Sequence, residues 1–181
     1  VLLRTVNGKL TALSVQDGQQ SWSIQQSMPR LSVRGSSSPV IARGMVISGF
    51  DNGHVAAFNV ADGSVIWDVL LEPPSGRTEI ERLVDINSDV QAAGTDVYAV
   101  GYQGRLGAIA LESGQMLWSQ ELSSHSGLCV DSNNIYVTDQ KSEIAALSRA
   151  SGREIWRSKV VRNRDASAPV AYAGSIVVGD F

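Results

Sequence analysis

The sequence of 181 residues is poor in several residue types, and each scarcity excludes a class of protein. Its one cysteine, Cys129, excludes an internal disulfide framework and any zinc or iron–sulfur site with several cysteine ligands. Only 18% of the residues are charged, and 15 Lys and Arg stand against 18 Asp and Glu, so nothing favours binding to nucleic acid or to anionic lipid. No apolar run approaches the ~20 residues that span a bilayer.

The four tryptophans mark an internal repeat, because each stands four residues after a glycine. The pairs are Gly18/Trp22, Gly63/Trp67, Gly114/Trp118 and Gly152/Trp156. Successive tryptophans are 45, 51 and 38 residues apart, a period typical of the blades of a β-propeller. We predict that each indole fills the space between two blades and donates its N–H to the backbone of a neighbouring blade.

Each period contains four short apolar segments joined by turns rich in glycine and asparagine, which favours antiparallel hairpins. No segment has a sustained helical period. The sequence therefore predicts an all-β fold, a propeller of four-stranded antiparallel blades, here about four and a quarter of an expected eight. Within one partial propeller spanning residues 1–181, we expect the blade pieces at 1–26, 36–71, 88–122, 126–160 and 166–181.

The two terminal pieces are incomplete blades, which predicts that the chain is a processed or excised part of a larger propeller. The first piece has segments for three strands, and the last has segments for two. An open blade exposes unpaired strand edges, and such edges recruit other chains. We therefore expect self-association through the open blades.

Candidate catalytic residues are scarce. His54 and His125 fall in different repeats without a third ligand at short spacing, and Cys129 lies in a strand-like apolar segment where a small buried side chain is the ordinary case. We expect no enzyme activity, no metal and no cofactor.

The segments that end in Gly-x-x-x-Trp resemble the repeat of propellers related to the pyrroloquinoline-quinone-dependent dehydrogenases. Two connections narrow the resemblance: Pro-Arg-Leu-Ser-Val-Arg-Gly at 29–35 and Arg-Thr-Glu-Ile-Glu-Arg-Leu-Val-Asp-Ile-Asn at 77–87. Both are similar to loops of the BamB family, eight-bladed propeller lipoproteins of the outer-membrane β-barrel assembly machinery (the BAM complex) of Gram-negative bacteria. The resemblance covers the whole chain.

The resemblance implies a non-catalytic scaffold that binds the periplasmic POTRA domains of BamA and assists the insertion of outer-membrane proteins. It implies a location at the periplasmic face of the outer membrane, held by a lipid anchor that these 181 residues lack, and unfolded outer-membrane proteins as further partners. Two alternatives stay open: a quinoprotein dehydrogenase, and a propeller that binds peptides by adding a strand.

The resemblance also implies which residues contact BamA. The apolar-x-apolar-Arg motif of the first loop falls on Leu31, Val33 and Arg34, and the Asp-x-Asp motif of the second falls on Asp85 and Asn87. Val33 stands where leucine is common in the family, and Asn87 where aspartate is usual. Arg82 joins them because its loop should emerge beside the Arg34 loop. From the residues alone, the alternative that Leu31 or Val33 packs beneath its loop stays open.

Overall fold

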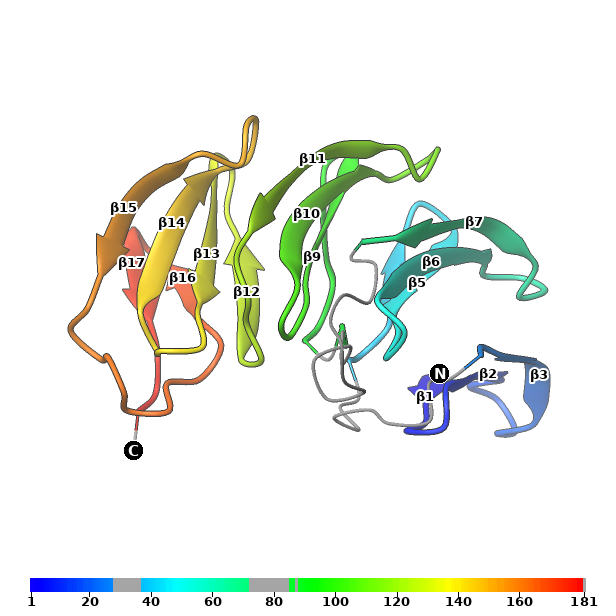
Figure 1. Ribbon diagram of the computed structural model, residues 1–181. Coiled ribbons are helices and arrows are strands. Elements are labelled where there is room, and N and C mark those ends of the chain that lie inside the picture. The colour runs from blue at the N-terminus through cyan, green and yellow to red at the C-terminus, as the bar shows by residue number, and fades with distance from the viewer. Residues whose placement is uncertain (28–36, 72–84, 87, 181) are drawn as a thin grey trace, which may run out of the picture.

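The computed structural model describes residues 1–27, 37–71, 85–86 and 88–180 (Figure 1). These residues contain seventeen β-strands and no helix, so no helix in this part of the chain could cross a membrane. The strands form five antiparallel sheets. Each sheet is a meander in which every strand pairs with its neighbour in the sequence, because tight turns join the strands.

The first sheet has three strands, the next three sheets have four each, and the last has two. The first consists of β1 (Leu2–Arg4), β2 (Lys9–Leu13) and β3 (Gln20–Gln25). The second consists of β4 (Val40–Ala42), β5 (Met45–Gly49), β6 (His54–Asn59) and β7 (Val65–Leu70). The third consists of β8 (Gln91–Ala93), β9 (Asp96–Val100), β10 (Arg105–Ala110) and β11 (Met116–Glu121). The fourth consists of β12 (Gly127–Val130), β13 (Asn134–Thr138), β14 (Ile144–Ser148) and β15 (Glu154–Ser158), and the last of β16 (Val170–Tyr172) and β17 (Ser175–Val177).

The sheets follow one another along an arc, with the first and last sheets at its two ends (Figure 1). The first strands of successive sheets contact each other, β4 with β8, β8 with β12 and β12 with β16. This is the blade arrangement of a propeller, so the predicted all-β propeller fold is confirmed.

The hydrophobic core lies between the sheets, and a separate cluster of buried side chains fills each of the first three interfaces. Leu10, Phe50 and Phe58 belong to the first cluster. All five residues of β5 are buried, because this strand has a sheet on both of its faces. Continuous apolar segments in the sequence therefore correspond to strands that are covered on both sides.

Three repeat tryptophans join one sheet to the next by a hydrogen bond from the indole Nε1. The acceptors are backbone carbonyls: Trp22 donates to Val60 at 2.9 Å, Trp67 to Leu111 at 2.8 Å and Trp118 to Arg149 at 2.9 Å. Each acceptor stands three residues before the repeat glycine of its sheet.

The repeat glycines receive these indoles. A Cβ placed on Gly63, Gly114 or Gly152 would lie 2.5 to 2.7 Å from the tryptophan ring of the preceding sheet. The three glycines also have positive φ angles of +74°, +72° and +68°. The tryptophan of one repeat therefore docks on the glycine of the next, and we call this contact a joint. The glycine and the tryptophan of a single Gly-x-x-x-Trp motif belong to two different joints, one with the preceding sheet and one with the following sheet.

Arg149 adds a polar link between the third and fourth sheets. Its Nη2 donates to Ala93 O at 2.9 Å and its Nε to the Tyr98 hydroxyl at 3.1 Å. Its Nη1 donates to Asp131 O and Ser132 O, both at 3.0 Å. Tyr98 is fully buried, and burial raises the pKa of its hydroxyl, so it stays a neutral partner.

Candidate functional site

The two predicted partner-binding loops are the connections from β3 to β4 and from β7 to β8. Of the residues predicted to contact a partner, Asp85 lies in the part of the chain that the structure describes. The others lie outside the described residues: Leu31, Val33, Arg34, Arg82 and Asn87.

The described ends of these two connections meet. The Ser38 N–H, just before β4, donates to Asp89 Oδ1, just before β8, at 2.5 Å. This bond spans 51 residues of sequence and lies at the surface. Both connections therefore enter their sheets at one place, and Asp89 is a site residue that the sequence reading missed.

The turn between β5 and β6, residues 50–53, lies beside both connections. The Asn52 Nδ2 donates to Ser27 O at 3.1 Å, where the first connection begins. The Ile86 N–H, near the end of the second connection, donates to Phe50 O at 3.2 Å. A Cβ on Gly49 would lie 2.3 Å from Ile86 Cγ2, so glycine there makes room for the Ile86 side chain. We call residues 50–53 the platform turn.

A buried ion pair ties the platform turn to the first sheet. Arg4 Nη2 lies 2.5 Å from Asp51 Oδ1, and both side chains are almost completely buried, at 1% and 0% exposure. The Arg4 guanidinium also lies 5.4 Å from the centre of the Phe50 ring, within the range of a cation–π contact. Losing the Arg4 charge would leave the Asp51 carboxylate buried without this counter-ion, so the pair holds the turn at a defined position.

Asp85 is fully buried. Its carbonyl accepts the Tyr102 N–H at 2.8 Å, and the two residues form an isolated antiparallel bridge. The contact of Asp85 with a partner stays a prediction. The buried placement suits a residue that secures the end of the long connection against β9 and β10.

A second feature missed from the sequence is a serine three residues before the first strand of each four-stranded sheet. Each of the three is buried and donates its Oγ–H to a backbone carbonyl of its own sheet. The bonds run from Ser37 to Gly49 O at 3.3 Å, from Ser88 to Val100 O at 3.0 Å and from Ser124 to Thr138 O at 2.5 Å. The constant spacing was the signal available in the sequence.

The residues considered for catalysis lie in separate environments. His54 Nδ1 lies 2.5 Å from Asp68 Oδ1, while His125 Nε2 lies 3.7 Å from Asp165 Oδ1. His125 and Cys129 both border a hollow of about 490 Å³ beside β12 and β16. Burial raises the pKa of the Cys129 thiol, which disfavours the nucleophilic thiolate. The described residues contain no group of three or more His, Cys, Asp or Glu that could hold a metal ion.

Comparison with known proteins identifies relatives over the whole chain. The outer membrane protein assembly factor BamB of Yersinia pestis is 41% identical over 180 residues, which are 99% of this chain and 46% of that protein. The crystal structure of BamB from Moraxella catarrhalis superimposes with a TM-score of 0.92 at 25% identity, covering 99% of this chain and 55% of that chain. The chain thus spans about half the length of the curated relatives it matches.

A europium-containing methanol dehydrogenase shares the fold, with a TM-score of 0.70 at 10% identity over 94% of this chain and 43% of its own. That likeness concerns the fold alone. The sequence model of the family described as outer membrane protein assembly factor BamB matches residues 1–158. The chain belongs to the BamB family of outer membrane protein assembly factors.

Proposed function

We propose that the protein is a non-catalytic scaffold of the outer-membrane β-barrel assembly machinery. It binds the POTRA domains of BamA and assists the insertion of outer-membrane proteins. It acts at the periplasmic face of the outer membrane, where a lipid anchor carried outside these 181 residues holds it. Its relatives are named as assembly factors, which supports a scaffold rather than an enzyme.

The contact surface in this proposal consists of the two connections that meet at the bond between Ser38 and Asp89. This bond is the observation that supports the proposal, because it joins the described ends of two connections that are 51 residues apart in the sequence. The platform turn contacts the same region through Asn52, which donates to Ser27 O, and through Phe50, whose carbonyl accepts the Ile86 N–H. Two adjoining loops on a rigid base can present one continuous surface to a partner.

The proposed roles within this surface differ. Leu31 and Val33 supply apolar area and Arg34 forms a charged contact, because arginine beside apolar side chains is enriched in interface cores. Arg82 and Asn87 contribute polar contacts from the second connection. Asp85, being buried, acts by positioning that connection.

Calorimetric titration of the protein with the POTRA domains of BamA tests the proposal. Replacing Arg34 with glutamate should weaken binding by ~2–5 kcal/mol if the contact is buried in the interface. Arg43→Glu is the matched control. Arg43 carries the same charge but is half-exposed in the turn between β4 and β5, and among the described residues it forms an ion pair with the exposed Glu112, at 3.0 Å. Surface pairs of this kind contribute at most ~1 kcal/mol to stability.

The outcomes separate the alternatives. Loss of binding in Arg34→Glu but not in Arg43→Glu supports the scaffold and its surface. Binding that survives both changes shows that BamA is a partner and contradicts the proposed contact surface. Absence of binding by the unchanged protein contradicts the scaffold, and cofactor absorbance on adding quinone and calcium then tests the dehydrogenase alternative.

A further inference from the structure

The first predicted partner-binding connection leaves β3 through Gln26 and Ser27, the last described residues before it. The Gln26 N–H donates to Gly8 O of its own sheet at 3.0 Å. The Gln26 side-chain Nε2 donates to Asp68 Oδ2 at 3.3 Å, in β7 of the next sheet. The Ser27 carbonyl accepts a hydrogen bond from Asn52 Nδ2 of the platform turn at 3.1 Å. The start of the connection is therefore held by both sheets.

The two groups on the second sheet are themselves joined through His54, the first residue of β6. The His54 N–H donates to Asn52 Oδ1 at 3.2 Å, and the ring Nδ1 of His54 lies 2.5 Å from Asp68 Oδ1. Asn52 and Asp68 thus each contact the start of the connection with one side-chain atom and His54 with another. We call Gln26, Ser27, Asn52, His54 and Asp68 the clamp.

A closed set of contacts fixes a side chain better than a single hydrogen bond does. The side-chain contacts of the clamp lie at the surface, where one bond contributes little by itself. Asn52 and Asp68, however, cannot rotate toward solvent without losing two contacts at once, because both terminal atoms of each side chain are engaged. Hydrogen bonds in such a network strengthen one another. The clamp therefore restrains Gln26 and Ser27 more than its separate bonds would.

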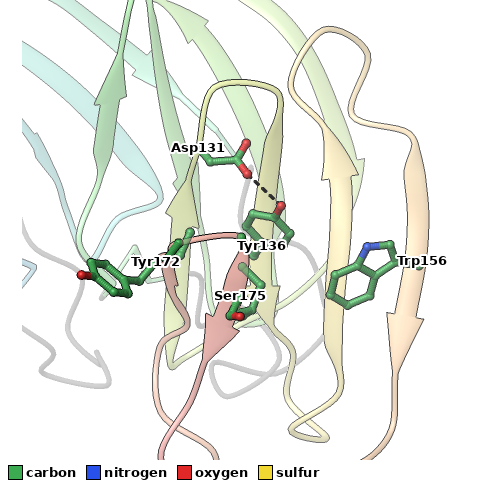
Figure 2. A pocket seen from close by; sticks show the side chains of 9 residues that line it. Asp131, Tyr136, Trp156, Tyr172 and Ser175 are labelled. Carbon is green, nitrogen blue, oxygen red and sulfur yellow. Dashed lines mark hydrogen bonds between the residues drawn. The ribbon is translucent and has the colours of Figure 1, made fainter.

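The fourth sheet holds a turn in the same way, through an aspartate that uses both of its oxygens. Asp131 Oδ1 accepts the N–H groups of Asn133 and Asn134 at 2.8 and 2.7 Å, and Asp131 Oδ2 accepts the Tyr136 hydroxyl at 2.8 Å. Figure 2 shows the last of these bonds, between the Asp131 carboxylate and the Tyr136 side chain. Asp131 thereby fixes the turn between β12 and β13, as Asp68 fixes the start of the connection after β3.

The other end of the first connection rests on the same hairpin of β5 and β6. The Ser37 Oγ–H donates to Gly49 O at 3.3 Å, at the end of β5. Asn52 and His54 follow Gly49 by three and five residues. Both described ends of the connection are therefore fixed to one hairpin. A segment whose ends are already fixed loses less conformational entropy when it binds a partner.

We propose that Asn52, His54 and Asp68 are positioning residues for partner binding. They hold Gln26 and Ser27 against the second sheet, so that the first connection is presented to the POTRA domains in one orientation. These residues act through the connection rather than by touching the partner. The inference rests on the proposed function and adds to it the residues that position its contact surface.

Calorimetric titration of the protein with the POTRA domains of BamA tests the inference. Gln26→Glu places a second carboxylate against Asp68, where the Gln26 amide now lies 3.3 Å from Asp68 Oδ2. It should raise the dissociation constant about threefold to tenfold, the effect of losing a hydrogen bond. Adding Asp68→Asn removes the like charge and supplies an amide donor, so the double variant should recover most of the affinity. Asn52→Ala, which removes the bond to Ser27, should weaken binding to a similar extent.

Gln140→Ala is the matched control. The Gln140 Nε2, in the turn between β13 and β14, donates to Ser123 Oγ at 2.6 Å, at the start of the connection that follows β11. The substitution removes a contact of the same kind at a connection that carries no predicted partner residue, so it should leave the dissociation constant unchanged. Urea unfolding of each variant checks that it is folded at the temperature of the titration.

A double-mutant cycle with Arg34 separates positioning from a general loss of stability. If the clamp acts through the first connection, Gln26→Glu should weaken binding much less in an Arg34→Ala background than in the parent protein, because the contact that it positions is already gone. A substitution that only destabilises the fold would weaken binding equally in both backgrounds.

The outcomes for the clamp and for the proposed function are distinct. Binding that is lost in Arg34→Glu but unchanged in Gln26→Glu and Asn52→Ala overturns the clamp alone. Equal weakening by Gln140→Ala, or an absence of coupling to Arg34, overturns it as well. Absence of binding by the unchanged protein, or binding that survives Arg34→Glu, contradicts the proposed function or its surface and the clamp with it. Weakening by both clamp substitutions, recovery on adding Asp68→Asn and coupling to Arg34 support the inference.

Discussion

A glycine-to-alanine substitution at one internal joint tests the docking of tryptophan on glycine most directly. At Gly114 the φ angle is +72°, and an added Cβ would lie 2.7 Å from Trp67 Cγ. Trp67 cannot easily move away, because its Nε1 donates to Leu111 O at 2.8 Å and its ring is 7% exposed. Gly114→Ala therefore adds both backbone strain and a clash with a fixed ring.

Two contributions determine the size of the effect. An L-residue in the left-handed region costs ~1–2 kcal/mol. Forcing an extra carbon into a packed site costs ~1–3 kcal/mol more. Gly114→Ala should thus lower the free energy of unfolding by ~2–5 kcal/mol. Gly44→Ala has a nearly equal φ of +77° with nothing within 4 Å of the added Cβ, so it should cost only the first ~1–2 kcal/mol.

Urea unfolding followed by far-ultraviolet circular dichroism measures both variants against the parent chain. A double mutant separates the two contributions further, because in a Trp67→Leu background the clash is gone and Gly114→Ala should cost no more than Gly44→Ala. Equal losses for Gly114→Ala and Gly44→Ala in the parent background would refute the docking argument.

Three further predictions concern buried and ionisable groups. Replacing Arg4 with methionine leaves Asp51 buried without this counter-ion and should lower the free energy of unfolding in urea by ~3–5 kcal/mol. Adding Asp51→Leu should recover most of that loss. A loss under ~1 kcal/mol in the single variant would contradict the paired arrangement. Burial raises the pKa of the Cys129 thiol, so alkylation at neutral pH should be much slower in the folded protein than in urea, and equal rates would show that the thiol is open to solvent. Burial acts to raise the pKa of Asp131, but two backbone N–H donors and the Tyr136 hydroxyl outweigh it and hold that pKa below the ordinary value. The stabilisation by this carboxylate is therefore present above the ordinary aspartate pKa and lost as the pH falls through the lowered one, so Asp131→Asn should reduce the loss of stability in acid, measured from urea midpoints.

The candidate site was predictable only in part. The two connections could be recognised by their motifs, and the charged and apolar residues in them remain predictions. The bond between Ser38 and Asp89 and the pair between Arg4 and Asp51 could not be predicted, because their partners are 51 and 47 residues apart in the sequence. Such contacts depend on the angle and distance at which one sheet packs on the next.

The burial of Asp85 is another feature that the sequence alone does not predict. An aspartate in a long polar connection suggests a surface charge, yet the structure buries it beside Tyr102. Burial of a single loop residue is decided by the sheets on both sides of it, so no local pattern reports it.

The sequence by itself determined the repeat, the four strands of each of the three complete blades and the place of the repeat tryptophans and glycines within them. It could do so because hairpin turns and short apolar strands are local features, encoded within ten or so residues. Only the tertiary structure decided which tryptophan meets which glycine. Stacking of the sheets brings Trp67 to Gly114 rather than to Gly63 of its own repeat.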